Sequence, residues 1–268
     1  PGVYRFQHLT HYALGGGQRF GLHSIRRWLQ TSQLIIRQHR QTPFDLLHAF
    51  WIDEAGFSAA IAARKLNRPL VASLGGGELT RLPELNYGAQ RFLIRRLTSR
   101  YVLNGARLIT AGSTFQLNLA RAHGGPEYKL RLAPLGVDTD RFQPASAGSG
   151  AAALIQAASL LPVKNQPLLL RLVSRVKAHL PRVQLHLAGD GPQRAALSRL
   201  ANQLDIGQNI IWHGAVPYPR MPACYHQARL YLQTSRHESQ GMAVLEAMAC
   251  GLPGVGTPGL KPVQSGSS

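Results

Sequence analysis

The chain has 268 residues, of which 44% are hydrophobic, so its composition argues against wholesale disorder and suits one large or two medium domains. It carries 30 lysines and arginines against 12 aspartates and glutamates, and the net charge of +18 indicates either anionic partners or a surface of solvated arginines. Its apolar runs fall far short of the ~20 residues of a membrane helix and its start resembles no secretory signal, so we expect an intracellular protein.

Short apolar runs alternate with amphipathic helical patterns along the chain. Apolar residues at helical spacing predict helices in 19–40, 55–66 and 165–180. Strands are predicted at 45–50, 69–73, 106–110, 153–159, 183–189, 209–214 and 229–235. Alternation of this kind is typical of parallel sheets covered by helices on both faces. The sequence therefore predicts an α/β fold.

A segment without apolar period divides this pattern. "QPASAGSGAAA" at 143–153 is rich in small residues, proline and glycine, as a linker is. We predict two Rossmann-like domains with parallel sheets facing a cleft, an N-terminal one at 1–145 and a C-terminal one at 146–268. In such sheets ligands bind beyond the carboxyl ends of the strands. The candidate ligand loops are those after 183–189, 209–214 and 229–235.

Several common sites are excluded because their motifs are missing. The stretch "GDGPQR" at 189–194 ends in arginine where a dinucleotide fingerprint needs glycine, and no P-loop, GxSxG or HExxH pattern occurs. Cys224 and Cys250 form neither a CxxC pattern nor a disulfide framework, and the histidines are scattered, so we predict two small buried cysteines and no metal site. Aromatic residues amount to 7% and lie within apolar patterns, which argues against a nucleic-acid partner.

The stretch "SRHESQGMAVLEAMACGLPGVGT" at 235–257 places Glu238 and Glu246 eight positions apart around a glycine. A helix beginning near Gly241 would turn its free N–H groups and its dipole toward the preceding loop, where they can hold a pyrophosphate. A carboxylate that accepts two hydroxyl hydrogen bonds suits a ribose diol or a sugar ring. The alternative is a capped helix with a solvated Glu246, and the stretch alone leaves both interpretations open.

This stretch resembles the E-x7-E signature of the family 4 glycosyltransferases of the GT-B fold. Further blocks resemble the same family in the same order, and they are "PLGVDTDRF" (134–142), "ASLLPVKNQPLLL" (158–170), "LHLAGDGPQRAAL" (185–197) and "IIWHGAVP" (210–217). The resemblance extends over most of the chain from Asp45. It implies metal-independent transfer of a sugar, with retained configuration, from a nucleotide-diphosphate sugar to a glycan or lipid-linked acceptor, with no further cofactor.

The resemblance also implies roles for particular residues. Lys164 would contact the donor's phosphates and Glu238 the transferred sugar, which makes these two the catalytic candidates. Glu246 would bind the ribose hydroxyls. The other donor-binding candidates would offer backbone groups or line the base, and they are Ser239, Gln240, Gly241, Met242, Ala243, Gly214, Ala215, Val216 and Gly189.

The chain departs from the family pattern in several places. Ser159 stands where many relatives carry an arginine, which weakens the phosphate clamp. Gly75 stands where many carry a histidine near the reacting centre, and Gly254 replaces a β-branched strand residue. The sequence opens at "GVYRF", which looks like a middle strand, and closes on "LKPVQSGSS", so we expect the first and last elements of the fold to be missing.

Other functions stay open beside glycosyl transfer. The departures at Ser159 and Gly75 are compatible with a catalytically impaired fragment, or with a non-enzymatic protein of the same fold that binds anions or a membrane surface. A sugar-nucleotide epimerase or a phosphorylase of the GT-B fold is a further alternative. An epimerase would need its own acid and base residues, and the sequence singles none out.

The basic helix at 19–40 suits a peripheral position on an anionic membrane. Its arginines are Arg19, Arg26, Arg27, Arg37 and Arg40, its apolar residues are Ile25, Trp28, Leu29, Ile35 and Ile36, and Arg91, Arg95, Arg96 and Arg100 follow in 91–100. The preferred explanation of the apolar stripe is an ordinary helix that packs Ile25, Trp28 and Leu29 against the sheet. The two are compatible, and we expect a cytoplasmic protein with peripheral contact at the cytoplasmic membrane face.

Overall fold

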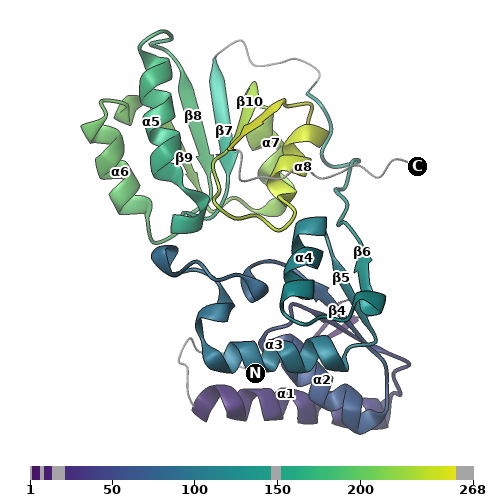
Figure 1. Cartoon of the computed structure of the whole chain (residues 1–268). Coiled ribbons are helices and arrows are strands. Elements are labelled where there is room, and N and C mark those ends of the chain that lie inside the picture. Colours follow the sequence, from purple (N-terminus) through teal and green to yellow (C-terminus); the bar gives the residue numbers. More distant parts are fainter. Residues whose placement is uncertain (1, 7–8, 14–21, 146–151, 258–268) are drawn as a thin grey trace. The chain divides into compact units, whose positions relative to one another are not determined.

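The computed structural model describes residues 2–6, 9–13, 22–145 and 152–257 (Figure 1). Contacts divide the chain into two compact units, of which unit 1 comprises residues 1–81 and 88–133 and unit 2 comprises residues 82–87 and 134–268. Most of the segment 143–153 that we predict to be a linker lies outside the described residues.

Unit 2 is built on a five-stranded parallel sheet with the order β11-β10-β7-β8-β9. Its strands are β7 (Ala153–Ala157), β8 (Gln184–Ala188), β9 (Ile210–Gly214), β10 (Leu230–Gln233) and β11 (Gly254–Gly256). Its helices are α5 (Gln166–Lys177), α6 (Arg194–Gln203), α7 (Met221–Tyr225) and α8 (Met242–Ala249). The chain proceeds from β7 through β8 to β9 on one side and then returns to place β10 on the other side of β7, which makes the β7/β10 boundary a topological switch point.

Two apolar cores cover the two faces of this sheet. Alternate residues of β8 separate them, because Leu185 and Leu187 join the core of α5 and α6, while Ala188 joins the core of α7 and α8. Figure 1 shows α5 and α6 on one side of the strands and α7 and α8 on the other. A parallel sheet buried on both faces needs largely apolar strands, and β7, β8, β9 and β10 are apolar except for one or two Gln or His residues in each.

Unit 1 is built on a four-stranded parallel sheet with the order β3-β4-β5-β6. Its strands are β3 (Leu47–Phe50), β4 (Leu70–Leu74), β5 (Leu108–Ala111) and β6 (Leu130–Leu132). Its helices are α1 (Leu22–Gln41), α2 (Glu54–Leu66), α3 (Leu93–Gly105) and α4 (Thr114–Ala122). Helix α2 packs on β3 and β4 and lies between α1 and α3, whereas α4 contacts β5 and β6.

The prediction of an α/β fold with two Rossmann-like parallel-sheet units is confirmed. Every strand predicted from apolar runs is present, and the strand ends differ by a few residues. The opening "GVYRF" is also a strand, β1 (Gly2–Phe6), but it pairs antiparallel with β2 (Leu9–Ala13) in a sheet of its own. Its expected place as a middle strand of the parallel sheet is therefore wrong in this structure.

The prediction that Ile25, Trp28 and Leu29 of helix α1 all pack inward is only partly right. Trp28 is buried against Phe57 of α2 with its ring edge-on, as the stripe predicts. Ile25 and Leu29, however, are both close to half exposed, because α1 packs on α2 rather than on the sheet and has a narrow contact face. None of the helices in the described ranges is long and apolar enough to cross a membrane.

Candidate functional site

The switch point brings together the loop after β7 and the loop after β10. Lys164 ends a short 3-10 turn in the first loop, and the second loop carries Glu238. Two hydrogen bonds to main-chain carbonyls join the loops. The Thr234 hydroxyl donates to the Lys164 carbonyl at 2.9 Å, and the Arg236 N–H donates to the Val163 carbonyl at 2.8 Å. Both contacts fix the direction in which Lys164 leaves the backbone.

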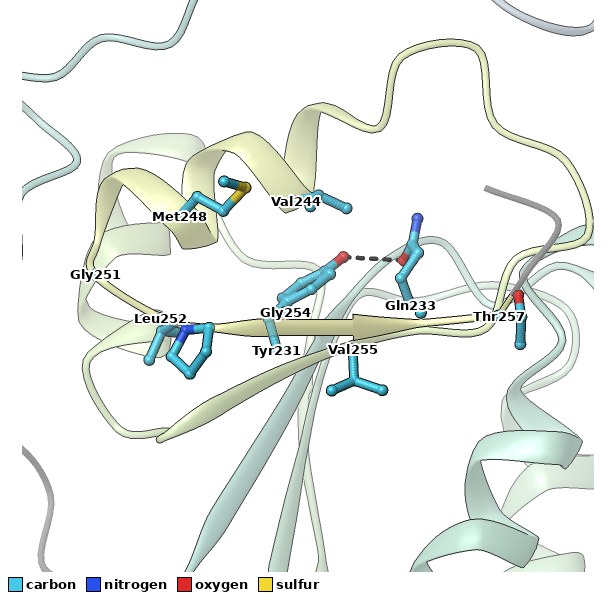
Figure 2. Close-up of a pocket in the computed structure, with 11 residues that line it drawn as sticks. Tyr231, Gln233, Val244, Met248, Gly251, Leu252, Gly254, Val255 and Thr257 are labelled. Atoms are coloured by element: carbon cyan, nitrogen blue, oxygen red, sulfur yellow. Dashed lines mark hydrogen bonds between the residues drawn. The ribbon is translucent and has the colours of Figure 1, made fainter. Parts of the chain in front are cut away.

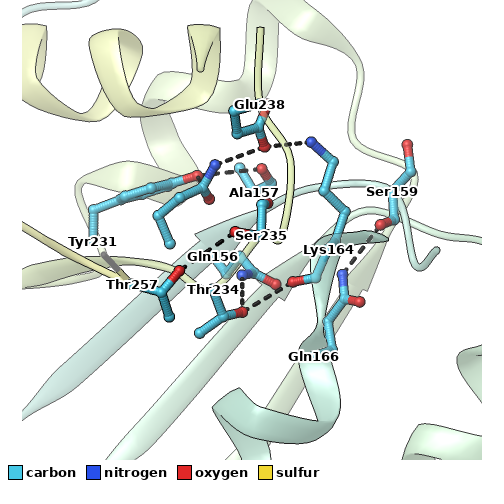
Figure 3. Close-up of polar contacts among 11 residues, drawn as sticks. Gln156, Ala157, Ser159, Lys164, Gln166, Tyr231, Thr234, Ser235, Glu238 and Thr257 are labelled. Carbon is cyan, nitrogen blue, oxygen red and sulfur yellow. Dashed lines mark hydrogen bonds and ion pairs between the residues drawn. The ribbon is translucent and has the colours of Figure 1, made fainter. Parts of the chain in front are cut away.

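Lys164 and Glu238 form an ion pair, with 2.5 Å between Nζ and Oε1 (Figure 3). The side chains retain 23% and 12% of their exposed area, so the pair is largely shielded from water. The same Oε1 accepts a hydrogen bond from Nε2 of Gln233 at 2.7 Å, and Oε1 of Gln233 accepts one from the Tyr231 hydroxyl at 3.1 Å. Glu238 is thus held by one cation and one neutral amide.

Buried polar side chains lie beneath this pair. Nε2 of Gln156 donates to the Thr234 hydroxyl at 3.0 Å, and both side chains are almost fully buried. Gln166, at the start of α5, donates to the Ser159 carbonyl at 3.1 Å. Our sequence reasoning missed Gln156, Gln233 and Thr234, although a glutamine inside an apolar parallel strand was a usable signal, because a buried amide needs partners.

The start of α8 has the geometry expected of a phosphate site. Gly241 precedes the helix with φ of 77°, a left-handed conformation that glycine adopts without strain. The first N–H groups of a helix, here those of Met242 and Ala243, have no intrahelical acceptor. The Gln240 side chain accepts a hydrogen bond from the N–H of Leu135 at 2.9 Å and donates one to its carbonyl at 2.6 Å, so it anchors the segment of unit 2 that precedes β7. Ser239 lies in the same loop, half-buried.

Glu246 has a different environment from Glu238. It is half-buried on α8, and its Oε2 accepts a hydrogen bond from the Tyr225 hydroxyl at 2.8 Å, which contradicts the alternative of a solvated Glu246. Burial raises the pKa of the Glu246 carboxyl, and the Tyr225 hydrogen bond opposes that shift. In the part of the chain that the structure describes, the two glutamates share no hydrogen-bond partner.

The candidates for lining a nucleotide base, Gly189 and Gly214 to Val216, lie where β8 and β9 end. Gly189 has φ of 142°, and a Cβ there would lie 2.0 Å from the Ala158 carbonyl oxygen, so the position admits only glycine. Its N–H donates to the Gly214 carbonyl at 2.8 Å, and Gly214 itself has φ of 67°. Beyond it Ala215 is exposed, while Val216 packs against the core of α7 and α8.

Two histidines and a tryptophan lie on β8 and β9, and they are His186, Trp212 and His213. His186 on β8 and His213 on β9 stack, with Nδ1 of the first 2.9 Å from Nε2 of the second. Burial lowers the pKa of both rings, and the neighbouring His213 lowers that of His186 further. The Arg194 guanidinium lies 3.6 Å from the centre of the Trp212 ring. None of these residues was a candidate from the sequence.

A pocket of about 620 Å³ lies between α8 and β11 (Figure 2). It is lined by Tyr231, Gln233, Val244, Met248, Gly251, Leu252, Pro253, Gly254, Val255, Gly256 and Thr257. Lys164, Glu238 and Glu246 do not line it, and Gln233 and Tyr231 connect its wall to the ion pair. Its lining is mostly apolar, so it offers little to a diphosphate.

In unit 1, the indole of Trp51 lies against Gly75 in the loop after β4. A Cβ at Gly75 would lie 2.4 Å from Nε1 of Trp51, so the indole occupies the space that a side chain would need. The Glu78 carboxylate accepts hydrogen bonds from the N–H groups of Gly75 and Gly76 at 2.8 and 2.6 Å. Burial raises the pKa of Glu78, and these amides oppose the shift.

Two further expectations concern the cysteines and metal binding. Cys224 and Cys250 are free and buried, as predicted. Among the described residues no group of three or more His, Cys, Asp or Glu side chains is placed to hold a metal ion, and metal independence stays a prediction.

Two parallel sheets covered by helices, one of them with a polar, lysine-bearing edge at its switch point, define an α/β protein with two Rossmann-like units. Residues 3–136 match the family described as Glycosyl transferase 4-like domain, and residues 138–263 match Glycosyl transferases group 1. The chain therefore belongs to the family 4 glycosyltransferases of the GT-B fold.

Similar proteins include a GDP-mannose-dependent alpha-(1-6)-phosphatidylinositol monomannoside mannosyltransferase of Mycolicibacterium smegmatis, 29% identical over 72% of this chain and 53% of that protein. A sulfoquinovosyl transferase of Arabidopsis thaliana is 25% identical over 84% of this chain and 45% of its own length. The chain thus spans about half the length of these curated relatives.

Solved structures share the fold at lower identity. Sucrose-phosphate synthase from Thermosynechococcus elongatus superimposes with a TM-score of 0.80 at 19% identity, over 96% of this chain and 67% of that one. HepE of Anabaena, solved with UDP and glucose, gives a TM-score of 0.71 at 20% identity, over 84% of this chain and 61% of that one.

Proposed function

We propose that this chain transfers a sugar from a nucleotide-diphosphate sugar to an acceptor, with retention of configuration and without a metal ion. The observation that carries the proposal is the Lys164–Glu238 pair, which is fixed at the switch point of unit 2 close in sequence to the start of α8. A cation and a helix start suit a diphosphate, and a carboxylate suits a sugar hydroxyl.

In this proposal Lys164 and the amides of Ser239 to Ala243 hold the diphosphate, and Glu238 accepts a hydroxyl of the transferred sugar. Glu246 accepts the ribose hydroxyls, since its carboxylate is already held in place by Tyr225. The loop from Gly214 to Val216 lines the base, and Gly189 lets the neighbouring loop approach β7 closely.

The transfer itself needs stabilisation of the departing diphosphate. Lys164 and the α8 dipole would supply it, because fixed positive groups stabilise negative charge that develops on a leaving group. Ser159 brings no charge to this site, so Lys164 carries more of the task than it would beside an arginine. The glutamates orient the donor and need not form the covalent intermediate of a retaining hydrolase.

The test is a donor screen followed by product analysis. Thermal unfolding is measured with UDP-, GDP- and ADP-sugars, starting with GDP-mannose because a relative is named for it. A donor at 100 times its dissociation constant is expected to add about 2.7 kcal/mol of stability. The anomeric configuration of the product and the rate with and without EDTA then test retention and metal independence. Binding without transfer to any acceptor would favour the impaired fragment, and epimerised donor would favour the epimerase.

For the acceptor we propose a glycan or lipid-linked molecule, met at an anionic membrane face on the cytoplasmic side. The observation in favour is the start of α3, where Phe92, Leu93, Ile94 and Leu97 are exposed beside Arg96 and Arg100. The relative named for a phosphatidylinositol acceptor agrees with this choice. On α1, Arg26, Arg37 and Arg40 are exposed in the same way, whereas Arg19 lies outside the described residues.

The structure removes two arginines from the expected membrane set. Arg95 is buried, and Arg95 and Arg27 both pair with Glu54, so neither can reach a lipid phosphate without breaking that contact. Each exposed arginine near an anionic surface contributes on the order of 1 kcal/mol, screened by salt. Co-sedimentation with vesicles of anionic or neutral lipid at low and high salt tests this. Equal binding to anionic and neutral vesicles, or no binding at low salt, would contradict the membrane proposal.

A further inference from the structure

We propose that Glu238 competes with the donor's diphosphate for Lys164, so that the site favours a sugar nucleotide over the nucleoside diphosphate that the reaction leaves. This inference rests on the proposed function, since it concerns how the same site tells donor from product. It adds a role to Glu238 that is distinct from holding the sugar.

Lys164, the proposed phosphate-binding cation, is already neutralised by Glu238. Nζ of Lys164 lies 2.5 Å from Glu238, and both side chains are mostly shielded from water. A diphosphate that binds Lys164 must therefore separate this pair or bring a second negative group close to the Glu238 carboxylate. Separation leaves a carboxylate in a poorly solvated place, and its charge then faces the incoming phosphates.

Gln233 determines what happens to Glu238 once Lys164 moves. The Tyr231 hydroxyl donates to Oε1 of Gln233, which turns the amide Nε2 toward Glu238. Burial raises the pKa of Tyr231, as do the charges of Glu238 and Glu246, so this hydroxyl remains a donor. Glu238 thus keeps one hydrogen bond and its position, but it gains no compensating charge.

A sugar supplies what the diphosphate alone does not. A hydroxyl of the transferred sugar donates to Glu238 and replaces the lysine as its second partner. A nucleoside diphosphate brings no such donor, so it meets the full cost of the broken pair. After transfer the sugar departs, the Lys164–Glu238 pair re-forms, and its re-formation helps to release the nucleoside diphosphate.

The test compares Glu238→Gln with the wild type by titration calorimetry against UDP, GDP and ADP, their sugar nucleotides, and inorganic pyrophosphate. The glutamine keeps the shape and the contact with Gln233 but carries no charge. We expect the variant to bind the preferred nucleoside diphosphate and pyrophosphate about tenfold more tightly, which corresponds to about 1.4 kcal/mol. The preference for the sugar nucleotide over the diphosphate is expected to shrink by at least the same factor.

Matched variants separate this effect from a general change in the domain. Glu246→Gln alters the other glutamate of the stretch, which accepts a hydrogen bond from Tyr225 and pairs with no cation among the described residues. This variant is expected to bind both the nucleoside diphosphate and the sugar nucleotide more weakly. Asp205→Asn removes the exposed partner of Lys177 in the same unit and is expected to change neither affinity. If Glu238→Gln does not fold, Glu238→Ala is expected to show the same gain.

The outcomes distinguish the two proposals. If the wild type binds and uses a sugar nucleotide but the Glu238 variants bind diphosphate no more tightly, competition by Glu238 is wrong and the function stands. If neither the wild type nor the variants bind any diphosphate or pyrophosphate, both proposals are overturned. A gain for diphosphate in a protein without transfer activity would support the competition and count against the function.

Discussion

Two glutamates, one in each unit, are held in contrasting ways. Glu54 of unit 1 binds two guanidinium groups, with Arg27 at 2.5 Å from one oxygen and Arg95 at 2.7 Å from the other. Glu238 of unit 2 binds one ammonium and one amide through a single oxygen. Both carboxylates are partly buried, so burial does not separate their roles.

The difference lies in the partners. A guanidinium is planar and permanently charged, and two of them saturate Glu54 and tie the starts of α1, α2 and α3 together. Burial pushes the pKa of Glu54 up, but the hydrogen bonds from Arg95 and Arg27 outweigh it and hold the pKa below its ordinary value. A lysine is a single charge on a flexible stem, so the contact of Glu238 can be exchanged. We conclude that Glu54 stabilises the fold, whereas Glu238 can exchange its contact with Lys164 when a ligand binds.

The largest expected effect comes from breaking the saturated glutamate. Glu54→Ala should lower the free energy of unfolding of unit 1 by about 3–5 kcal/mol, because it removes the carboxylate that pairs with both the buried Arg95 and Arg27. Glu238→Ala should cost less, about 1–3 kcal/mol, because it leaves Nε2 of the buried Gln233 without this acceptor while Lys164 can turn to water. Urea unfolding of both variants measures this. Equal costs would remove the distinction between the two sites.

Lys164→Ala should weaken binding of the preferred nucleoside diphosphate by about 2 kcal/mol and leave binding of the nucleoside almost unchanged. The reason is that, in the proposed binding mode, the Lys164 ammonium contacts the phosphates of the ligand and no part of the nucleoside. Calorimetry with the two ligands measures the difference. A uniform loss, or none, would mean that the ion pair at the switch point is structural like that of Glu54.

Glu246→Ala should weaken donor binding by about 1.5 kcal/mol, through the lost hydrogen bonds to the ribose. Because burial raises the pKa of Glu246, the wild type should also lose donor affinity as the pH falls through a value above the ordinary 4.5, since the protonated acid accepts fewer hydroxyl bonds. Glu246→Gln should bind weakly with no such pH dependence. Affinity profiles from pH 4 to 8 on both proteins decide it.

The smallest expected effect concerns the His186–His213 pair. Both pKa values are lowered in the folded state, so the unfolded chain binds protons more readily, and the stability of unit 2 should fall as the pH drops below about 6.5. The stability conferred by the neutral pair is present above that pH. His186→Gln should flatten the slope, as followed by thermal unfolding between pH 5 and 8. An unchanged slope would assign the acid sensitivity to other groups.

The sequence was sufficient for the elements that burial dictates. Continuous apolar runs such as 183–189 can be satisfied only in a sheet covered on both faces, so the strands and their order of appearance were predictable. The polar side chains around Lys164 and Glu238 were not predictable, because Gln156 or Gln233 looks like an interruption of its strand until the neighbouring strand is known. The prediction that Arg95 is exposed was wrong for the same reason. Its place in "RFLIRRLTSR" suggests a solvent-exposed side chain, while the carboxylate that it contacts, Glu54, lies 41 residues away in the sequence.

The stacking of Arg194 on Trp212 has a practical consequence for experiments on this protein. The chain has three tryptophans, of which Trp28 and Trp51 belong to unit 1 and Trp212 to unit 2. With Trp28 and Trp51 changed to phenylalanine, emission would come from one indole in contact with a cation and adjacent in sequence to His213. That single fluorophore lies two residues before the loop where the base is expected, so its intensity would report donor binding without any attached label.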